Sequence, residues 1–130
     1  MKKINKIFAE ISAGELIDKI TILEIKQEKI KDASKLQSIK TELTSLQQTL
    51  NEHITLDDEI KKLSDELKKI NFKLWDIEDG KRNCEKEKNF GEKFIELARN
   101  VYLFNDQRAK IKLQINNHLG SNIKEVKSYD

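Results

Sequence analysis

Hydrophobic residues recur every three or four positions along most of the chain, which is the spacing of one face of an α-helix. The pattern predicts four helices, near residues 13–31, 35–52, 57–88 and 92–119. In the second and third of these, leucine and isoleucine keep an almost unbroken heptad spacing, which is typical of coiled-coil packing. The spacing leaves open whether the seam joins two helices of one chain or two chains of a dimer.

Residues with known capping preferences stand at the predicted helix starts. Ser12 and Glu15 form the S-x-x-E capping box before the first helix, and Ser34 and Gln37 repeat this signature before the second. Asp57 is suited to cap the third helix. The predicted starts therefore rest on local chemistry as well as on periodicity.

Both ends of the chain lie outside the predicted helices. Residues 4–11 alternate loosely between apolar and polar types, which predicts an extended arm or a short strand. Gly120 is the expected C′ residue of the fourth helix. The tail, residues 121–130, includes Ile123, Val126 and Tyr129, and it packs back on the helices, pairs with the N-terminal arm or frays.

Connections of two to six residues make consecutive helices antiparallel neighbours. The predicted fold is all-α, an antiparallel up-and-down bundle of about four helices built from helical hairpins. We expect one domain over residues 1–130, with an N-terminal arm (1–11), a bundle (12–120) and a tail (121–130). The residues expected to be buried are Leu43, Leu46, Leu63, Leu67, Val101 and Ile115.

Composition supports long helices and argues against sheet folds. Charged residues make up 37% of the chain and hydrophobic residues only 37%, so the burying surfaces must be narrow stripes. The chain has no proline and four glycines, which leaves little of the turn chemistry that sandwiches, barrels and doubly wound sheets require.

Charge and cysteine content exclude several classes of function. The net charge is +2 and no segment forms a basic tail, so a nucleic-acid-binding role is not expected. No apolar run approaches the length of a membrane span. The single cysteine, Cys84, cannot form an internal disulfide and indicates a reducing, cytoplasmic setting. His53 and His118 stand alone, so neither a metal site nor another cofactor is expected.

Several segments resemble, in the same order, a family of small, functionally uncharacterised bacterial and phage proteins known as a domain of unknown function. These segments are GELIDKITILEIK (14–26), LWDIED (74–79), FIELARNVY (94–102), NDQRA (105–109) and the KSY ending (127–129). The resemblance covers nearly the whole chain and implies a small helical protein with a loose link to surface-polysaccharide genes. Gly80 departs from the family pattern, in which a longer, often basic residue is expected, so the third helix should be weakened there.

Polar side chains interrupt the apolar faces of three predicted helices. They are Arg108, Lys112, Asn105, Glu24, Asn71 and Glu78. Arg108 lies nearest the centre of its apolar arc. A buried charge without a partner costs several kcal/mol, so Arg108 must find acceptors. Arg108 either donates to Glu24 or Glu78 in a network in which every polar group has a partner, or it joins Lys112 in a pocket for a small anion such as a carboxylate or phosphate. In the second case, both glutamates serve as orienting or acid/base groups.

Further apolar residues lie away from the main stripes, and the termini or another protein must cover them. They are Ile22 and Ile25 on the first helix, and Ile95, Tyr102 and Leu113 on the fourth. The sequence thus predicts a cytoplasmic interaction or scaffold protein that self-associates as a homodimer. The alternative is a protein or enzyme that binds a small anionic ligand through the polar residues. An exposed strip at Ile22 and Ile25 favours the first function, and a cleft ringed by the polar residues favours the second.

Overall fold

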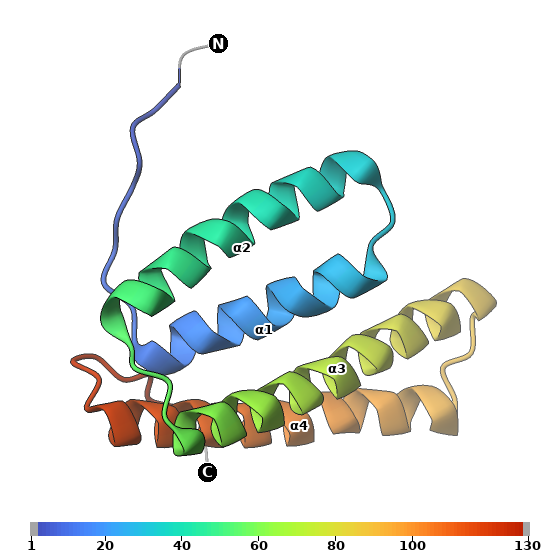
Figure 1. Ribbon diagram of the computed structural model, residues 1–130. Coiled ribbons are helices and arrows are strands. Elements are labelled where there is room, and N and C mark those ends of the chain that lie inside the picture. Colours follow the sequence, from blue (N-terminus) through green and yellow to red (C-terminus); the bar gives the residue numbers. More distant parts are fainter. Residues whose placement is uncertain (1–2, 129–130) are drawn as a thin grey trace.

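The chain folds into four helices joined by short connections, shown in Figure 1 for a computed structural model that describes residues 3–128. The helices are α1 (Ala13–Lys29), α2 (Ala33–His53), α3 (Asp58–Glu87) and α4 (Glu92–Leu119). No strand occurs among the described residues. The all-α prediction is confirmed, and every predicted helix end lies within two residues of the observed one.

Acidic and hydroxyl side chains cap the first three helices. Ser12 and Asp57 cap α1 and α3, and each accepts a hydrogen bond from the backbone N–H three residues on, at 3.1 and 2.9 Å. The prediction that Ser34 caps α2 was wrong, because Asp32 does so and accepts from the Lys35 N–H at 2.8 Å. A carboxylate suits this place because it also interacts favourably with the positive end of the helix dipole.

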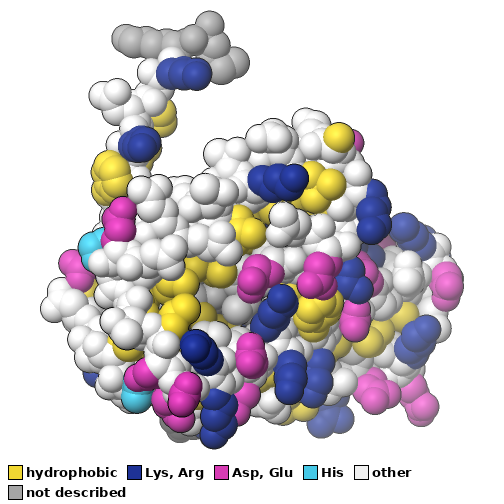
Figure 2. Space-filling model, in the orientation of Figure 1, with side chains coloured by type: hydrophobic (Ala, Val, Ile, Leu, Met, Phe, Trp, Pro, Cys, Tyr) yellow, Lys and Arg dark blue, Asp and Glu magenta, His cyan; other side chains and the backbone are white. Residues whose placement is uncertain are grey.

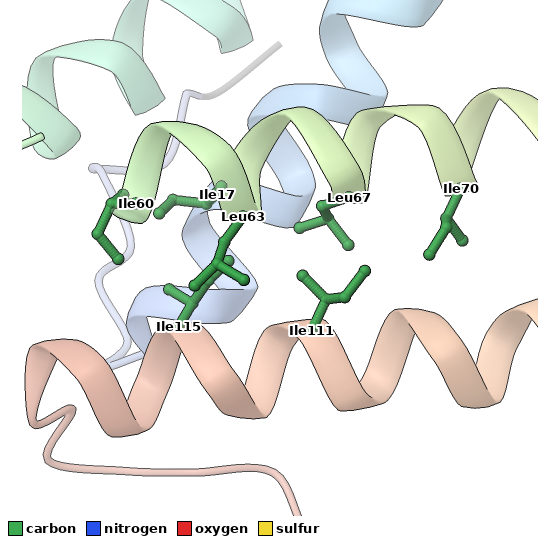
Figure 3. Packing of buried hydrophobic residues seen from close by; sticks show 7 residues of the cluster. All are labelled: Ile17, Ile60, Leu63, Leu67, Ile70, Ile111 and Ile115. Carbon is green, nitrogen blue, oxygen red and sulfur yellow. The ribbon is translucent and has the colours of Figure 1, made fainter. Parts of the chain in front are cut away.

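Helix α1 lies between α2 on one side and the α3–α4 hairpin on the other (Figure 1). The cluster that joins α1 to α3 and α4 consists of Ile17, Ile60, Leu63, Leu67, Ile70, Ile111 and Ile115 (Figure 3). The cluster that joins α1 to α2 consists of Leu16, Ile20, Leu23, Ile39 and Leu43. The heptad stripes of α2 and α3 therefore pack on α1 and α4, and not on each other.

The prediction of buried residues is confirmed at four of the six positions. Leu43, Leu63, Leu67 and Ile115 are buried, whereas Leu46 and Val101 are only partly buried. Figure 1 shows that the α3–α4 hairpin extends beyond the end of α1, and that α2 packs on one side only. Side chains in these parts have fewer neighbouring elements to cover them, which explains the two partial exposures.

The expected weakness of α3 at Gly80 is not observed, because the helix runs without interruption from Asp58 to Glu87. A Cβ atom at Gly80 would lie 3.1 Å from the Leu97 Cδ1 atom of α4. The absence of a side chain therefore allows α4 to approach α3 closely at this point.

The two terminal segments differ in how they relate to the bundle. Residues 3–11 form the extended arm, not a strand, and carry the exposed side chains of Ile7 and Phe8 away from the helices (Figures 1 and 2). The tail turns back after Gly120, whose φ of 63° favours glycine. Its Asn122 donates a hydrogen bond to Glu10 at 2.6 Å, so this part of the tail contacts the N-terminal arm. Tyr129 lies outside the described residues.

None of the helices in the described part of the chain has the length and apolar character needed to cross a membrane.

Candidate functional site

The most deeply buried charge in the described chain belongs to Asp18, which is 1% exposed and lies on the face of α1 toward α4. Arg108 of α4 makes a two-pronged contact with it. The Arg108 Nε atom donates to Asp18 Oδ1 at 3.0 Å, and Nη2 pairs with Oδ2. Arg108 Nη1 also donates to Asn105 Oδ1 at 3.3 Å. The guanidinium is thus held in one orientation by a bidentate partner.

Neutral side chains complete the hydrogen bonding of Asp18. Asn71 of α3 donates through Nδ2 to Asp18 Oδ1 and to Thr21 Oγ1, both at 2.9 Å. The Thr21 hydroxyl in turn donates to the backbone carbonyl of Asp18 at 2.8 Å. In the described chain, every buried side-chain nitrogen and oxygen has a hydrogen-bond partner. The network therefore joins α1, α3 and α4 without an unpaired polar group in the core.

Lys112, one turn after Arg108, extends the network toward the tail. Its side chain is 9% exposed, and Nζ donates to Glu15 Oε2 at 2.7 Å and to Glu125 Oε2 at 3.2 Å. The same nitrogen lies 3.8 Å from Asp18 Oδ2. Three carboxylates, two from α1 and one from the tail, therefore surround one buried ammonium group.

Both cations in this network are stabilised in their charged form. The hydrogen bond with Asp18 raises the pKa of Arg108, although burial opposes the change. Burial on its own lowers the pKa of Lys112, but the hydrogen bonds and charges of Glu15, Asp18 and Glu125 outweigh burial and raise it. The surroundings of both side chains therefore favour the charged form over the neutral form.

A close approach of α1 to α4 sets the position of Asp18. The Gly14 N–H donates to the Asn116 Oδ1 atom at 2.6 Å, and Asn116 is fully buried. A Cβ atom at Gly14 would lie 2.5 Å from the backbone carbonyl oxygen of Lys112. Only glycine allows the start of α1 to lie this close to α4, which brings Asp18 within reach of Arg108.

The structure brings together four of the six predicted polar residues. Asn71 and Arg108 both donate to Asp18, Asn105 accepts from Arg108, and Lys112 lies beside them. The prediction that Glu24 is a partner of Arg108 was wrong. It lies near Lys68, at 3.8 Å, because the arc of α1 on which it stands does not face Arg108.

Glu78 is the second predicted partner that does not bind Arg108. Its carboxylate is exposed and lies 3.5 Å from Lys81 Nζ, one turn further along α3. It nevertheless lines the same cleft as Arg108. Glu78 is therefore a rim residue of the site and not a partner in the buried network.

Asp18 was missed by sequence reasoning, although a signal was present. Gly14, Asp18, Thr21 and Ile25 are spaced by four, three and four residues, which is a second helical stripe. All four are buried or packed against α3 and α4. An aspartate inside such a stripe requires a buried cation, and Arg108 is the cation that the structure supplies.

A cleft of about 500 Å³ opens between α1, α3 and α4 beside this network. Its apolar lining comes from Ile22, Ile25, Leu74 and Trp75, and its polar lining from Asn71, Glu78, Asp79, Arg82, Asn105 and Arg108. The expected exposed strip at Ile22 and Ile25 is therefore not present. Ile25 is 1% exposed because α3 and α4 cover it, and Ile22 is partly buried in the cleft wall.

A second, smaller hollow of about 240 Å³ lies on the other side of Arg108. It is lined by Asn105, Arg108, Ala109, Lys112, Glu125 and Lys127. Arg108 and Asn105 border both spaces. We call the larger space the Trp75 cleft and the smaller one the Lys112 hollow.

The other predicted surface residues lie on the outside of α4. Ile95, Tyr102 and Leu113 are all exposed, and Leu113 borders a hollow that is also lined by tail residues 124–127. Among the described residues, no group of three or more histidine, cysteine or acidic side chains is arranged to hold a metal ion.

Comparison with known proteins identifies a family but no characterised relative. No curated protein and no solved structure matches the chain. A family described as a family of unknown function, DUF6165, matches residues 7–130, which include all four helices and every residue of the Asp18–Arg108 network. On this evidence, the chain belongs to the DUF6165 family.

Proposed function

We propose that the protein binds a small anionic organic molecule in the Trp75 cleft, with Arg108 as the residue that anchors it. The observation that carries this proposal is that the Arg108 guanidinium has N–H groups without an acceptor in the described chain. Three of its N–H groups donate to Asp18 and Asn105, and an arginine has five, so two have no acceptor among the described residues. The side chain is 29% exposed and lines the Trp75 cleft.

The cleft has the size and lining of a small-molecule site. Its volume of about 500 Å³ lies within the usual range of ~300–1,000 Å³ for such sites. Trp75 and Leu74 offer an apolar wall on which a ring or planar group can pack. Arg82, Glu78 and Asp79 at the rim offer donors and acceptors that could orient the hydroxyl or amide groups of a ligand.

A fixed arginine is better suited to anion recognition than a mobile one. Asp18 and Asn105 already hold the guanidinium plane, so a ligand need not order a long side chain when it binds. Asp18 reduces the net charge at this point, which favours a ligand that pairs with the guanidinium through geometry as well as charge. Carboxylate and phosphate groups meet this requirement because they accept two parallel hydrogen bonds from arginine.

Thermal-shift screening against sugars, nucleotides and phosphorylated metabolites tests the proposal, with Trp75 fluorescence as a second readout. Trp75 is the single tryptophan, so its emission reports directly on the cleft. A ligand at one hundred times its dissociation constant should stabilise the fold by about 2.7 kcal/mol.

The matched variants for this screen are Arg108→Lys and Arg99→Lys. Lysine keeps the charge but not the bidentate geometry, so Arg108→Lys should weaken binding at least tenfold, or about 1.4 kcal/mol. Arg99 is exposed on the same helix, and its replacement should leave affinity unchanged. Equal affinity in the two variants, or no hit in the screen, would refute the proposal.

A second candidate function is self-association as a homodimer, in keeping with an interaction or scaffold role in the cytoplasm. The observation that favours it is the exposed apolar strip of Ile95, Tyr102 and Leu113 on α4. Light scattering at micromolar concentration should then give twice the 15.2 kDa mass of one chain. Tyr102→Glu should return the protein to that mass, and Tyr102→Phe should not.

A further inference from the structure

The Lys112 hollow holds a carboxylate of the protein itself, in the form of Glu125. We propose that this hollow is a subsite for a phosphate group and that Glu125 occupies it as an internal competitor when no ligand is bound. The inference rests on the proposed function, because it assigns the anionic part of the ligand to the Lys112 hollow and the apolar part to the Trp75 cleft.

The lining of the Lys112 hollow carries more positive than negative side chains. Three cationic side chains, Arg108, Lys112 and Lys127, line it, and Glu125 is the one anionic group in the lining. Glu125 is held by Lys127 at 2.7 Å and by Lys112 at 3.2 Å, and these contacts lower the pKa of its carboxyl group. A carboxylate is therefore already bound where an external anion would bind.

The two carboxylates that accept hydrogen bonds from Lys112 differ in how firmly the fold holds them. Glu15 stands in the first turn of α1, whose position against α4 is set by the close approach at Gly14. Glu125 stands in a tail segment without helix or strand, and its side chain is 46% exposed. The next residue, Val126, is also exposed. Displacing Glu125 would therefore remove little buried surface, whereas displacing Glu15 would disturb the core.

A phosphate group can make more hydrogen bonds in the Lys112 hollow than the Glu125 carboxylate makes. Glu125 pairs with both lysines but has no hydrogen bond to Arg108, whose two remaining N–H groups lack acceptors in the described chain. A phosphate monoester has three terminal oxygens and can accept from Arg108 and from both lysines together. An external carboxylate would only repeat the two contacts that Glu125 already makes.

The Trp75 cleft and the Lys112 hollow share Arg108 and Asn105 as a common wall. A molecule with its phosphate on Arg108 and Lys112 can extend past Asn105 toward Trp75. The expected ligand class is therefore a phosphate monoester of a small organic molecule with a ring. Glu125 and Lys127 stand in the same tail segment, so exchange of the Glu125 carboxylate for a phosphate held by Lys127 should change the conformation of the tail.

Titrations followed by Trp75 fluorescence and calorimetry test this inference with four probes: phenyl phosphate, benzoate, phenol and inorganic phosphate, all at matched ionic strength. Phenyl phosphate should bind most tightly. Inorganic phosphate should bind more weakly and leave Trp75 emission unchanged, because it reaches only the hollow. Benzoate binding as tightly as phenyl phosphate would overturn the preference for phosphate.

The decisive variant is Glu125→Gln, which removes the competing charge and keeps the size of the side chain. It should tighten phenyl phosphate binding up to about fivefold, because the Glu125 side chain is 46% exposed and solvent screening limits its pairing with the lysines to about 1 kcal/mol. Glu42→Gln, at an exposed position on α2, changes the net charge equally and should have no effect. Amide resonances of residues 121–128 should shift on addition of phosphate in the wild type.

The outcomes separate the two proposals. If phenyl phosphate binds and Arg108→Lys weakens it, but Glu125→Gln behaves like Glu42→Gln and the tail resonances stay unchanged, the internal competitor is refuted and the binding function stands. If neither phenyl phosphate nor the metabolite screen gives binding in any variant, both proposals are refuted. If phosphate shifts the tail resonances while no organic compound perturbs Trp75, the hollow stands as an anion site and the Trp75 cleft is refuted.

Discussion

Replacing Arg108 with methionine should destabilise the fold by an amount that follows from the surroundings of Asp18. Methionine fills much of the same space but has no N–H donor, so Asp18, 1% exposed, loses its charged partner. Two groups would remain near the carboxylate, the Asn71 amide at 2.9 Å and the Lys112 ammonium at 3.8 Å. Breaking a buried pair costs about 3–5 kcal/mol, and these two groups place the expected loss at the lower end, about 3 kcal/mol.

The reciprocal change should cost less, because the two partners differ in exposure. After Asp18→Asn, the Arg108 side chain, 29% exposed, can turn toward water, and the new amide oxygen can still accept a hydrogen bond. We expect a loss of about 1–2 kcal/mol. The double variant should be more stable than the sum of the single losses predicts, by at least about 1 kcal/mol, because no buried charge is left alone.

Urea unfolding followed by circular dichroism measures these differences. With a slope of about 2 kcal/mol per molar urea, a loss of 3 kcal/mol lowers the midpoint by about 1.5 M. Arg99→Met, at an exposed position on the same helix, is the control and should stay within about 0.5 kcal/mol of the wild type. The reasoning is refuted if Arg108→Met unfolds at the same urea concentration as Arg99→Met, or if the two single losses add in the double variant.

Two further predictions concern backbone approach and pH. Gly14→Ala should destabilise the fold by about 1–3 kcal/mol, because the new Cβ atom would meet the backbone carbonyl of Lys112. Gly80→Ala should be close to neutral, because the new Cβ atom would meet only the flexible end of the Leu97 side chain and alanine favours the helix. Equal melting temperatures of the two variants would contradict this prediction. The hydrogen bond to Asp57 raises the pKa of His118 above 6.5, so the pair stabilises the fold fully below that pH and loses its effect as the pH rises through the raised pKa. His118→Gln should therefore lower the melting temperature at about pH 6 and not at about pH 9, and a loss independent of pH would contradict the role of the pair.

Local patterns in the sequence were sufficient for the helices and much of the core. Leu43, Leu63 and Leu67 are buried because one helix face alone must carry the apolar surface, and this follows from spacing. Ser12 and Asp57 cap their helices through hydrogen bonds to the residue three positions later, so the sequence alone predicts these caps. Such features depend on neighbours in the chain and not on how the helices are arranged.

The partners of Arg108 could not be predicted in the same way. Glu24 and Glu78 were predicted as acceptors because each interrupts the apolar face of its own helix. Asp18 belongs to α1, and no short connection fixes the register of α1 against α4. That register follows from the contact between Gly14 and Asn116, two residues that are 102 positions apart in the chain. A helix enclosed on two sides also has two buried stripes, whereas Ile22 and Ile25, on the second side of α1, were expected to be covered by the termini or by another protein.

The packing of α2 on α1 alone has a consequence for how the protein opens. Only the cluster around Ile39 and Leu43 holds most of α2 in place, whereas α1, α3 and α4 share both a larger apolar cluster and the Asp18–Arg108 network. Hydrogen exchange should therefore proceed fastest, among the four helices, in the first half of α2 and slowest around Leu67 and Ile115. Excursions of α2 would leave Asp18 and Arg108 in contact, so the binding cleft and the least stable helix can fluctuate independently.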